Sequence, residues 1–287
     1  MTAPGTDIET LVEVTPASDL ARLVRVWKPP TEPWGAVLIV HGLGEHCGRH
    51  DRTASAFASA GLLVRSFDLE GHGGSGGRRG HVASWDVFVD AVGEELARLR
   101  AEKAPVALYG HSMGSAIALS YALSDRPQPD ALILSAPPVT GHGLAMWKEW
   151  AAKVLGRLTP KLVIPNEIEG EQLTHDKEIA AAYDADPMVL TKSTVGLGRA
   201  GFGAVRANAA SLDRLRIPTL VIHGGADTVV PPQHSLALAR IPTVERRLYP
   251  SLRHEIFHEP EGAAVLADVV DWLRRTFTER QGSKASG

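Results

Sequence analysis

The chain has 287 residues, of which 44% are hydrophobic and 22% are charged, and its formal net charge is −3. This composition is typical of a globular protein with one large or two smaller domains, and the near balance of charge argues against nucleic acid or an anionic membrane as the main partner. The longest apolar runs, such as Ala36–Val40, are as long as a strand and too short to span a bilayer.

Two features bear on the cellular compartment. The opening residues MTAPGTDIETLVEV lack a basic start followed by an apolar stretch, which argues against a signal peptide. Cys47 is the only cysteine, so no internal disulfide can form, which fits a reducing compartment. We therefore expect a cytoplasmic protein.

Apolar runs of strand length alternate along the chain with segments of helical periodicity. RLVRVWK (Arg22–Lys28) alternates polar and apolar residues and predicts an antiparallel strand near the start. Further strands are expected at Ala36–His41, at Leu62–Asp68 and in the runs VALYG, ALILSA, PTLVIHG and VERRLYP. Helices are expected at His50–Ala60, Trp85–Glu102 and Ala267–Phe277. This alternation predicts an α/β fold with a mostly parallel sheet covered by helices on both faces.

One long segment interrupts this alternation. Between Pro137 and about Ala210 there is no convincing core strand, whereas connections in compact α/β units are normally short. We therefore expect residues 137–210 to form an inserted, largely helical cap, with residues 1–136 and 211–287 forming the core.

The run LYGHSMGSAIALS (Leu108–Ser120) places a serine between two glycines where a strand becomes a helix. In this context G-x-S-x-G is the turn that exposes a nucleophilic serine above a sheet. The turn would hold Ser112 in a strained conformation, and side chains at Gly110 or Gly114 would collide with the neighbouring helix and strand. We therefore predict Ser112 as a nucleophile.

A serine nucleophile needs a base, and the base needs an orienting acid, which this motif places in the chain order serine, acid, histidine. The strand in TLVIHGGADTVVPP runs into Asp227, at the sheet edge where such folds build their sites. The strand in VERRLYPSLRHEIFHEP is followed by a loop with His254, the predicted base. His258 is its main rival, and His223 is expected to be a core histidine inside a strand.

The run VHGLGE (Val40–Glu45) follows the first buried strand, and its glycines allow backbone N–H groups to point inward. The predicted oxyanion hole combines the N–H of Leu43 with that of Met113, the residue after the nucleophile. The twelve histidines are scattered rather than spaced as metal ligands, so no metal or cofactor is expected.

Taken in order, several motifs make the chain resemble the α/β-hydrolase superfamily, and more closely its monoacylglycerol lipase and lysophospholipase branch. The resemblance covers nearly the whole chain and rests on HGLGEHCGR, FDLEGHGGSGGRRGHV, LYGHSMGS, ILSAPPV, AYDADPMV, VIHGGADTVVPP and RHEIFHEPE. The sequence departs from the family at Ser115, where relatives often have glycine.

The resemblance implies the same catalytic roles for Ser112, Asp227 and His254 and the same oxyanion donors. It also implies that Glu45, Arg49, Tyr183 and His111 lie near the glycerol end of a substrate. From the residues alone, Glu45 and Arg49 are four positions apart near a helix start, so a structural ion pair is an equal alternative.

We therefore expect a serine carboxylester hydrolase that cleaves monoacylglycerols through an acyl-enzyme. The alternatives are a broad short-chain esterase, a lysophospholipase, a thioesterase or a perhydrolase with the same triad, or a ligand-binding receptor with slow turnover. The segment Leu144–Leu158 gathers two tryptophans and several aliphatic residues on one helical face. This stripe either packs on the core or contacts a membrane surface transiently.

Overall fold

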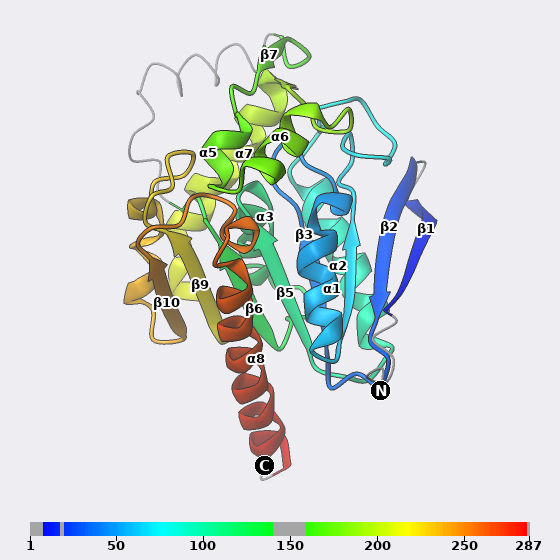
Figure 1. Cartoon of the computed structure of the whole chain (residues 1–287), viewed down its shortest axis with the longest axis vertical. Coiled ribbons are helices and arrows are strands. Elements are labelled where there is room, and N and C mark those ends of the chain that lie inside the picture. Colours follow the sequence, from blue (N-terminus) through cyan, green and yellow to red (C-terminus); the bar gives the residue numbers. More distant parts are fainter. Residues whose placement is uncertain (1–7, 18–19, 140–158, 286–287) are drawn as a thin grey trace.

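The computed structural model describes residues 8–17, 20–139 and 159–285 (Figure 1). Its centre is an eight-stranded sheet in the order β1-β2-β4-β3-β5-β6-β9-β10. In chain order its strands are β1 (Glu9–Ala17), β2 (Leu20–Lys28), β3 (Gly35–Val40), β4 (Leu62–Phe67), β5 (Val106–His111), β6 (Ala131–Ser135), β9 (Thr219–Gly224) and β10 (Val244–Tyr249). Only β1 and β2 pair antiparallel to their neighbours, which confirms the mostly parallel sheet predicted from the sequence.

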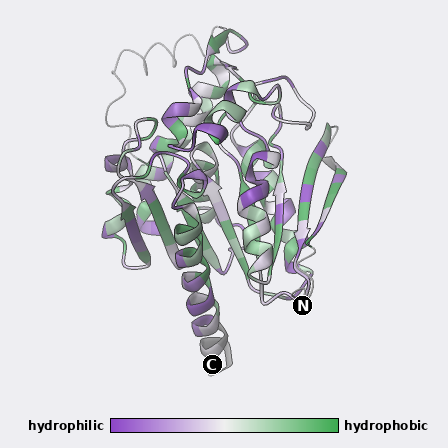
Figure 2. Ribbon diagram, in the orientation of Figure 1, coloured by the Kyte–Doolittle hydropathy of each residue, from purple (hydrophilic) through white to green (hydrophobic). Residues whose placement is uncertain are grey.

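Helices cover both faces of this sheet, because alternate residues of its buried strands face opposite sides. In β3, Leu38 and Val40 pack in a cluster with α2 (Asp86–Arg100) and α3 (Met113–Ala122). Val37 and Ile39 pack on the other face with α1 (Asp51–Ser59) and α8 (Gly262–Ala285). Figure 2 shows the central strands as largely hydrophobic, whereas α8 mixes hydrophobic and hydrophilic residues.

The predicted strands and helices are present, with two differences at the ends of the chain. Strand β1 was not predicted from the sequence. Its apolar residues Val12 and Val14 are 58% and 67% exposed, so the strand has no apolar face buried in the core, which is the feature that the prediction of strands relies on. Helix α8 runs from Gly262 to Ala285 and so extends beyond both ends of the predicted helix Ala267–Phe277. Among the described residues, no helix is both long enough and apolar enough to cross a membrane.

In the described part of the segment predicted as a cap, five helices and strands lie between β6 and β9. They are β7 (Val163–Pro165), α5 (Gly170–Leu173), α6 (Lys177–Ala185), β8 (Lys192–Thr194) and α7 (Val195–Ala210), and they gather at one end of the sheet (Figure 1). Strands β7 and β8 form a separate antiparallel pair. Helix α7 packs on α3, where Asn208 Nδ2 donates to the carbonyl of Ala116 at 2.9 Å. The predicted amphipathic helix Leu144–Leu158 lies outside the described residues.

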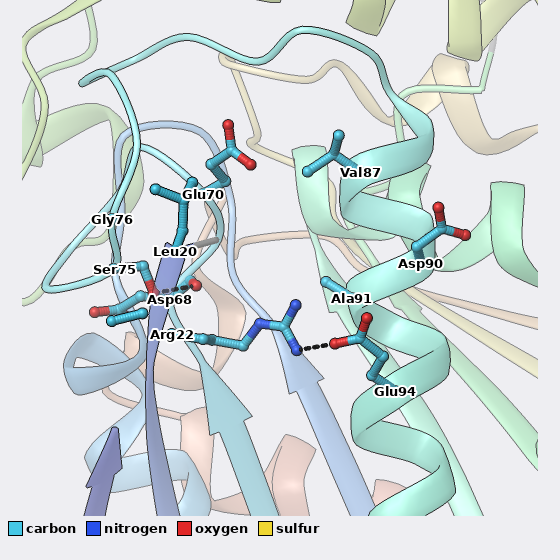
Figure 3. A pocket seen from close by; sticks show the side chains of 11 residues that line it. Leu20, Arg22, Asp68, Glu70, Ser75, Gly76, Val87, Asp90, Ala91 and Glu94 are labelled. Carbon is cyan, nitrogen blue, oxygen red and sulfur yellow. Dashed lines mark hydrogen bonds and ion pairs between the residues drawn. The ribbon is translucent and has the colours of Figure 1, made fainter. Parts of the chain in front are cut away.

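A buried ion-pair cluster joins α2 to the antiparallel side of the sheet. The fully buried carboxylate of Glu95 lies 2.9 Å from Arg22 Nη1 and 2.5 Å from Arg65 Nε. Arg22 also contacts Glu94, which is half exposed and borders a pocket of about 190 Å³ (Figure 3). This pocket lies between β2, α2 and the loop after β4, and none of the predicted site residues lines it. The cluster therefore serves packing rather than the predicted site.

Candidate active site

The predicted nucleophile sits on the sharp turn between β5 and α3. Ser112 has φ 52° and ψ −118°, a conformation that L-residues rarely adopt. A Cβ at Gly110 would overlap the carbonyl of Gly114, and one at Gly114 would overlap the carbonyl of Val40. The strained turn and the need for both glycines, which the sequence predicts, are therefore present.

Asp227 and His254 are joined although 27 residues separate them. Asp227 follows β9, and its Oδ2 lies 2.7 Å from His254 Nδ1. Its Oδ1 accepts hydrogen bonds from the backbone N–H groups of Val229 at 2.9 Å and Val230 at 2.8 Å. Burial alone would raise the pKa of Asp227, but hydrogen bonds from His223 and His254 outweigh it and lower that pKa. The carboxylate is therefore ionised and fixed in direction.

The same contact determines the state of His254, which is 3% exposed. Burial alone would lower its pKa, but the hydrogen bond and charge of Asp227 outweigh burial and raise that pKa above the ordinary 6.5. Since the Nδ1 proton points to the carboxylate, Nε2 is left to exchange a proton with a reacting group. This is the arrangement that a general base requires.

The two competing histidines occupy other positions. His258 Nδ1 lies 2.6 Å from Glu255 Oε2, so it pairs with a different carboxylate. His223 is a buried strand residue, as predicted, with Nε2 2.8 Å from the carbonyl of Val230. Its Nε2 also lies 3.3 Å from Asp227 Oδ2, which makes it a second neighbour of that carboxylate. Pattern reasoning from the sequence missed this contact.

The loop after β3 lies directly against Ser112. A Cβ at Gly42 would lie 3.2 Å from Ser112 Cβ, so glycine permits this close approach. Among the hydrogen bonds of the described residues, neither the N–H of Leu43 nor that of Met113 has an acceptor. Both predicted oxyanion donors are thus available to a ligand beside Ser112.

His41 fixes the peptide that carries the Leu43 N–H. His41 Nε2 accepts a hydrogen bond from the N–H of Leu69 at 3.0 Å, so the proton is on Nδ1. Nδ1 in turn lies 2.8 Å from the carbonyl oxygen of Gly42. Because C=O and N–H of a trans peptide point in opposite directions, this contact turns the Leu43 N–H away from His41. From its sequence pattern, His41 was expected only as the last residue of a strand, with no such role.

The four residues predicted near the glycerol end of a substrate converge in space. Arg49 Nε lies 3.7 Å from Glu45 Oε1, and Arg49 Cζ lies 4.5 Å from the centre of the Tyr183 ring. Arg49 Nη2 also contacts both carboxylate oxygens of Glu255, at 2.8 and 2.7 Å. The predicted Glu45–Arg49 ion pair is therefore present, and Glu255, which the sequence analysis missed, is the stronger partner.

His111 links this polar cluster to the predicted base. Its ring centre lies 4.8 Å from that of His254, and its Nδ1 lies 3.2 Å from Ser135 Oγ. Burial lowers the pKa of His111 to about 3, so the ring is neutral at physiological pH. Glu45, His111 and Glu255 place potential metal-ligand atoms within 4.8 Å of one another. However, Arg49 already pairs with both carboxylates, so Glu45 and Glu255 belong to an ion-pair cluster with Arg49, and the neutral His111 lies beside it.

The chain matches known proteins over most of its length. The sequence model of the family described as serine aminopeptidase, S33, matches residues 31–261. The chain is 38% identical over 256 residues to the monoacylglycerol lipase of Mycolicibacterium smegmatis, a match that covers 86% of this chain and 91% of that protein.

Solved structures show the same fold. The monoacylglycerol lipase of Paleococcus ferrophilus has a TM-score of 0.79 at 29% identity, covering 90% of this chain and 99% of that one. A soluble variant of the Saccharomyces cerevisiae monoglyceride lipase, in complex with a substrate analog, has a TM-score of 0.84 at 24% identity, covering 96% and 97%. The chain therefore belongs to the serine aminopeptidase S33 family of α/β-hydrolases, in the branch of the monoacylglycerol lipases, and is a carboxylic ester hydrolase.

Proposed function

We propose that this enzyme hydrolyses monoacylglycerols to glycerol and fatty acid, with Ser112, His254 and Asp227 as its catalytic triad. The observation that carries the proposal is the 2.7 Å contact between buried Asp227 and His254, whose ring lies beside the turn that presents Ser112. A carboxylate, an imidazole and a hydroxyl in this order constitute the machinery of acyl transfer through a serine.

The reaction proceeds in two steps. Ser112 Oγ attacks the ester carbonyl while His254 Nε2 takes its proton, and the developing oxyanion is stabilised by the N–H groups of Leu43 and Met113. His254 then protonates the leaving glycerol oxygen, and an acyl-enzyme remains on Ser112. In the second step His254 activates a water molecule, which releases the fatty acid and restores the serine. Asp227 keeps the Nδ1 proton in place and stabilises the imidazolium throughout.

The polar cluster beside His254 supports glycerol as the leaving group. In this proposal Glu45, Arg49, His111 and Tyr183 line the end of the site that receives the glycerol hydroxyls. Residues 137–210 act as the cap that encloses a single acyl chain. Further support comes from the names of the relatives, since the matched proteins of Mycolicibacterium smegmatis and Paleococcus ferrophilus are both monoacylglycerol lipases.

We also propose that the enzyme meets its substrate at a membrane surface through the cap. The aliphatic side chains of Leu162, Val163 and Ile164 are 48%, 46% and 43% exposed around β7. Exposed Lys161 and Lys192 flank them, so apolar contact and attraction to anionic lipid act together.

Vesicle sedimentation with anionic liposomes tests this contact. The triple variant Leu162→Ser, Val163→Ser and Ile164→Ser should lose vesicle binding and activity on long-chain monoacylglycerol, while keeping its activity on a water-soluble ester. The control variant Val12→Ser with Val14→Ser changes aliphatic residues on β1 that are 58% and 67% exposed, more than those around β7, and should keep both properties. Equal vesicle binding by the two variants would contradict the surface proposal.

The central experiment combines a nucleophile variant with a substrate series. Ser112→Ala should remain folded and lose about a millionfold in kcat, because triad members act as a unit. A fluorophosphonate should label Ser112 in the wild type, and labelling of another serine would exclude this assignment. Activity in the variant comparable to that of the wild type would do the same.

The substrate series separates the alternatives. The rates of hydrolysis of monoacylglycerols with short, medium and long chains are compared with those of triacylglycerols, lysophospholipids and acyl thioesters. Perhydrolysis activity is measured separately. We expect fast cleavage of monoacylglycerols and poor cleavage of triacylglycerols, since a cap that encloses a single acyl chain has no room for the three acyl chains of a triacylglycerol. Preference for short soluble esters would indicate a broad esterase. Tight binding of monoacylglycerol with negligible turnover would indicate a receptor instead.

A further inference from the structure

A single buried carboxylate joins the cap segment to the loop that carries His254. Glu259 is fully buried, and its Oε1 accepts a hydrogen bond from the N–H of Arg253 at 2.6 Å. Its Oε2 accepts from the N–H of His175 at 2.8 Å, and Oε1 also lies 3.0 Å from the His175 ring. One side chain thus holds two backbone segments that are 78 residues apart in sequence (253 − 175).

Neighbouring contacts join the same two segments. The N–H of Glu255 donates to the carbonyl of Leu173 at 2.8 Å. Thr174 Oγ1 donates to the carbonyl of His258 at 2.9 Å, and Arg253 Nη1 donates to the carbonyl of Thr174 at 3.0 Å. The backbone is therefore held immediately before and immediately after His254, and both attachments lead to residues 173–175.

We infer that Leu173–His175 and Glu259 form a clasp that sets the position of His254, and that Glu259 is a positioning residue for the reaction. The clasp rests on the proposed triad and goes beyond it, because it gives residues 173–175 a part in proton transfer as well as in covering the substrate. His254 must point Nδ1 at Asp227 and Nε2 at the reacting oxygen, so a small backbone displacement disturbs both hydrogen bonds together.

The variant Glu259→Gln tests the clasp with little change of shape. An amide presents one oxygen and one NH₂ group, whereas the two carboxylate oxygens face two N–H donors. In either orientation of the amide, its NH₂ group faces one of the backbone N–H groups of Arg253 and His175. Two donors cannot bond to each other, so one of these two hydrogen bonds is lost. We expect kcat on a water-soluble ester to fall about 10- to 100-fold. KM should stay within about twofold, because the residues proposed to bind substrate are unchanged.

The pH profile separates positioning from a merely structural role. A displaced His254 has a weaker bond to Asp227, so the acid limb of kcat/KM should move to lower pH. The rate of labelling by a neutral fluorophosphonate should fall in parallel. The charged and titratable groups that face His254 are otherwise unchanged in the variant: Asp227, His111, Glu255 and Glu45.

Controls make the outcome decisive. Glu261→Gln removes an exposed carboxylate two positions away and should leave kcat and the pH profile unchanged. If Glu259→Gln does not fold, two variants of Thr174 test the clasp instead. Thr174→Val removes the hydroxyl that contacts His258, so its activity should fall. Thr174→Ser keeps this hydroxyl, so its activity should stay near that of the wild type. Wild-type kcat and an unmoved acid limb in both Glu259→Gln and Thr174→Val would overturn the clasp. Activity retained by Ser112→Ala would instead overturn the proposed triad.

Discussion

Replacing Asp227 with asparagine should reverse the tautomer of His254 with little change in shape. Asp227 Oδ1 accepts two backbone N–H groups, from Val229 and Val230. Only the amide oxygen of asparagine can take this place, so its NH₂ group must face His254 Nδ1, where Oδ2 lies 2.7 Å away in the wild type. Two donors cannot face each other, so the proton of His254 moves to Nε2. The nitrogen that should accept the serine proton is then blocked.

The size of the effect follows from the loss of this base. A wrong tautomer in a serine triad lowers kcat about 10⁴-fold, which corresponds to about 5.4 kcal/mol of transition-state stabilisation. In the wild type Asp227 raises the pKa of His254 above 6.5, and the base must be neutral to act. The acid limb of kcat/KM therefore lies above pH 6.5 in the wild type and should move to lower pH in Asp227→Asn.

Rates with a water-soluble ester across the pH range measure both effects, and nitrogen-detected NMR of the imidazole reports the tautomer directly. The matched control is Asp271→Asn, which makes the same chemical change at an exposed position on α8. It should retain wild-type rates and the wild-type profile. A kcat within about tenfold of wild type for Asp227→Asn, or an unmoved acid limb, would refute the assignment of Asp227 as the orienting acid.

Three further predictions concern stability and reactivity. Burial and the nearby Asp68 carboxylate raise the pKa of the Cys47 thiol. A disulfide reagent such as DTNB should therefore modify Cys47 only after the protein unfolds. Rapid reaction of the native protein would be inconsistent with this environment. Glu95→Ala should lower the free energy of unfolding by about 3–5 kcal/mol, because it removes the fully buried carboxylate shared by Arg22 and Arg65 and leaves them only the more exposed Glu94 and Glu13. Glu94→Ala, at a half-exposed position, should cost less than about 1 kcal/mol in the same urea titration, and equal losses would contradict the burial argument. In α7 nothing lies within 4 Å of a Cβ at Gly203, so Gly203→Ala should raise the free energy of unfolding by up to about 1 kcal/mol. A destabilised Gly203→Ala variant would show that this position is not open. By contrast, Gly114→Ala should abolish activity, because its Cβ would overlap the carbonyl of Val40.

Local patterns in the sequence were sufficient to predict the fold class and to select the residues of the proposed triad. Each buried parallel strand is a short continuous apolar run, so its position can be predicted without knowing its neighbours. The serine turn can be recognised because a strand, two glycines and a helix occur within a few residues. Asp227 and His254 follow because carboxyl ends of parallel strands meet at one edge of the sheet.

Only the tertiary structure decided the partners of many other buried polar groups. Arg49 pairs with Glu255 across 206 positions, and Glu259 joins Arg253 to His175 of the inserted segment. The only ion-pair partner predicted for Arg49 was Glu45, since that prediction relied on helical spacing. Hydrogen bonds and ion pairs depend on distances of a few ångströms, and these are set by how strands and loops distant in sequence pack together. No local pattern encodes them, because the same carboxylate would serve equally well as a solvated surface residue until the fold buries it against its partner.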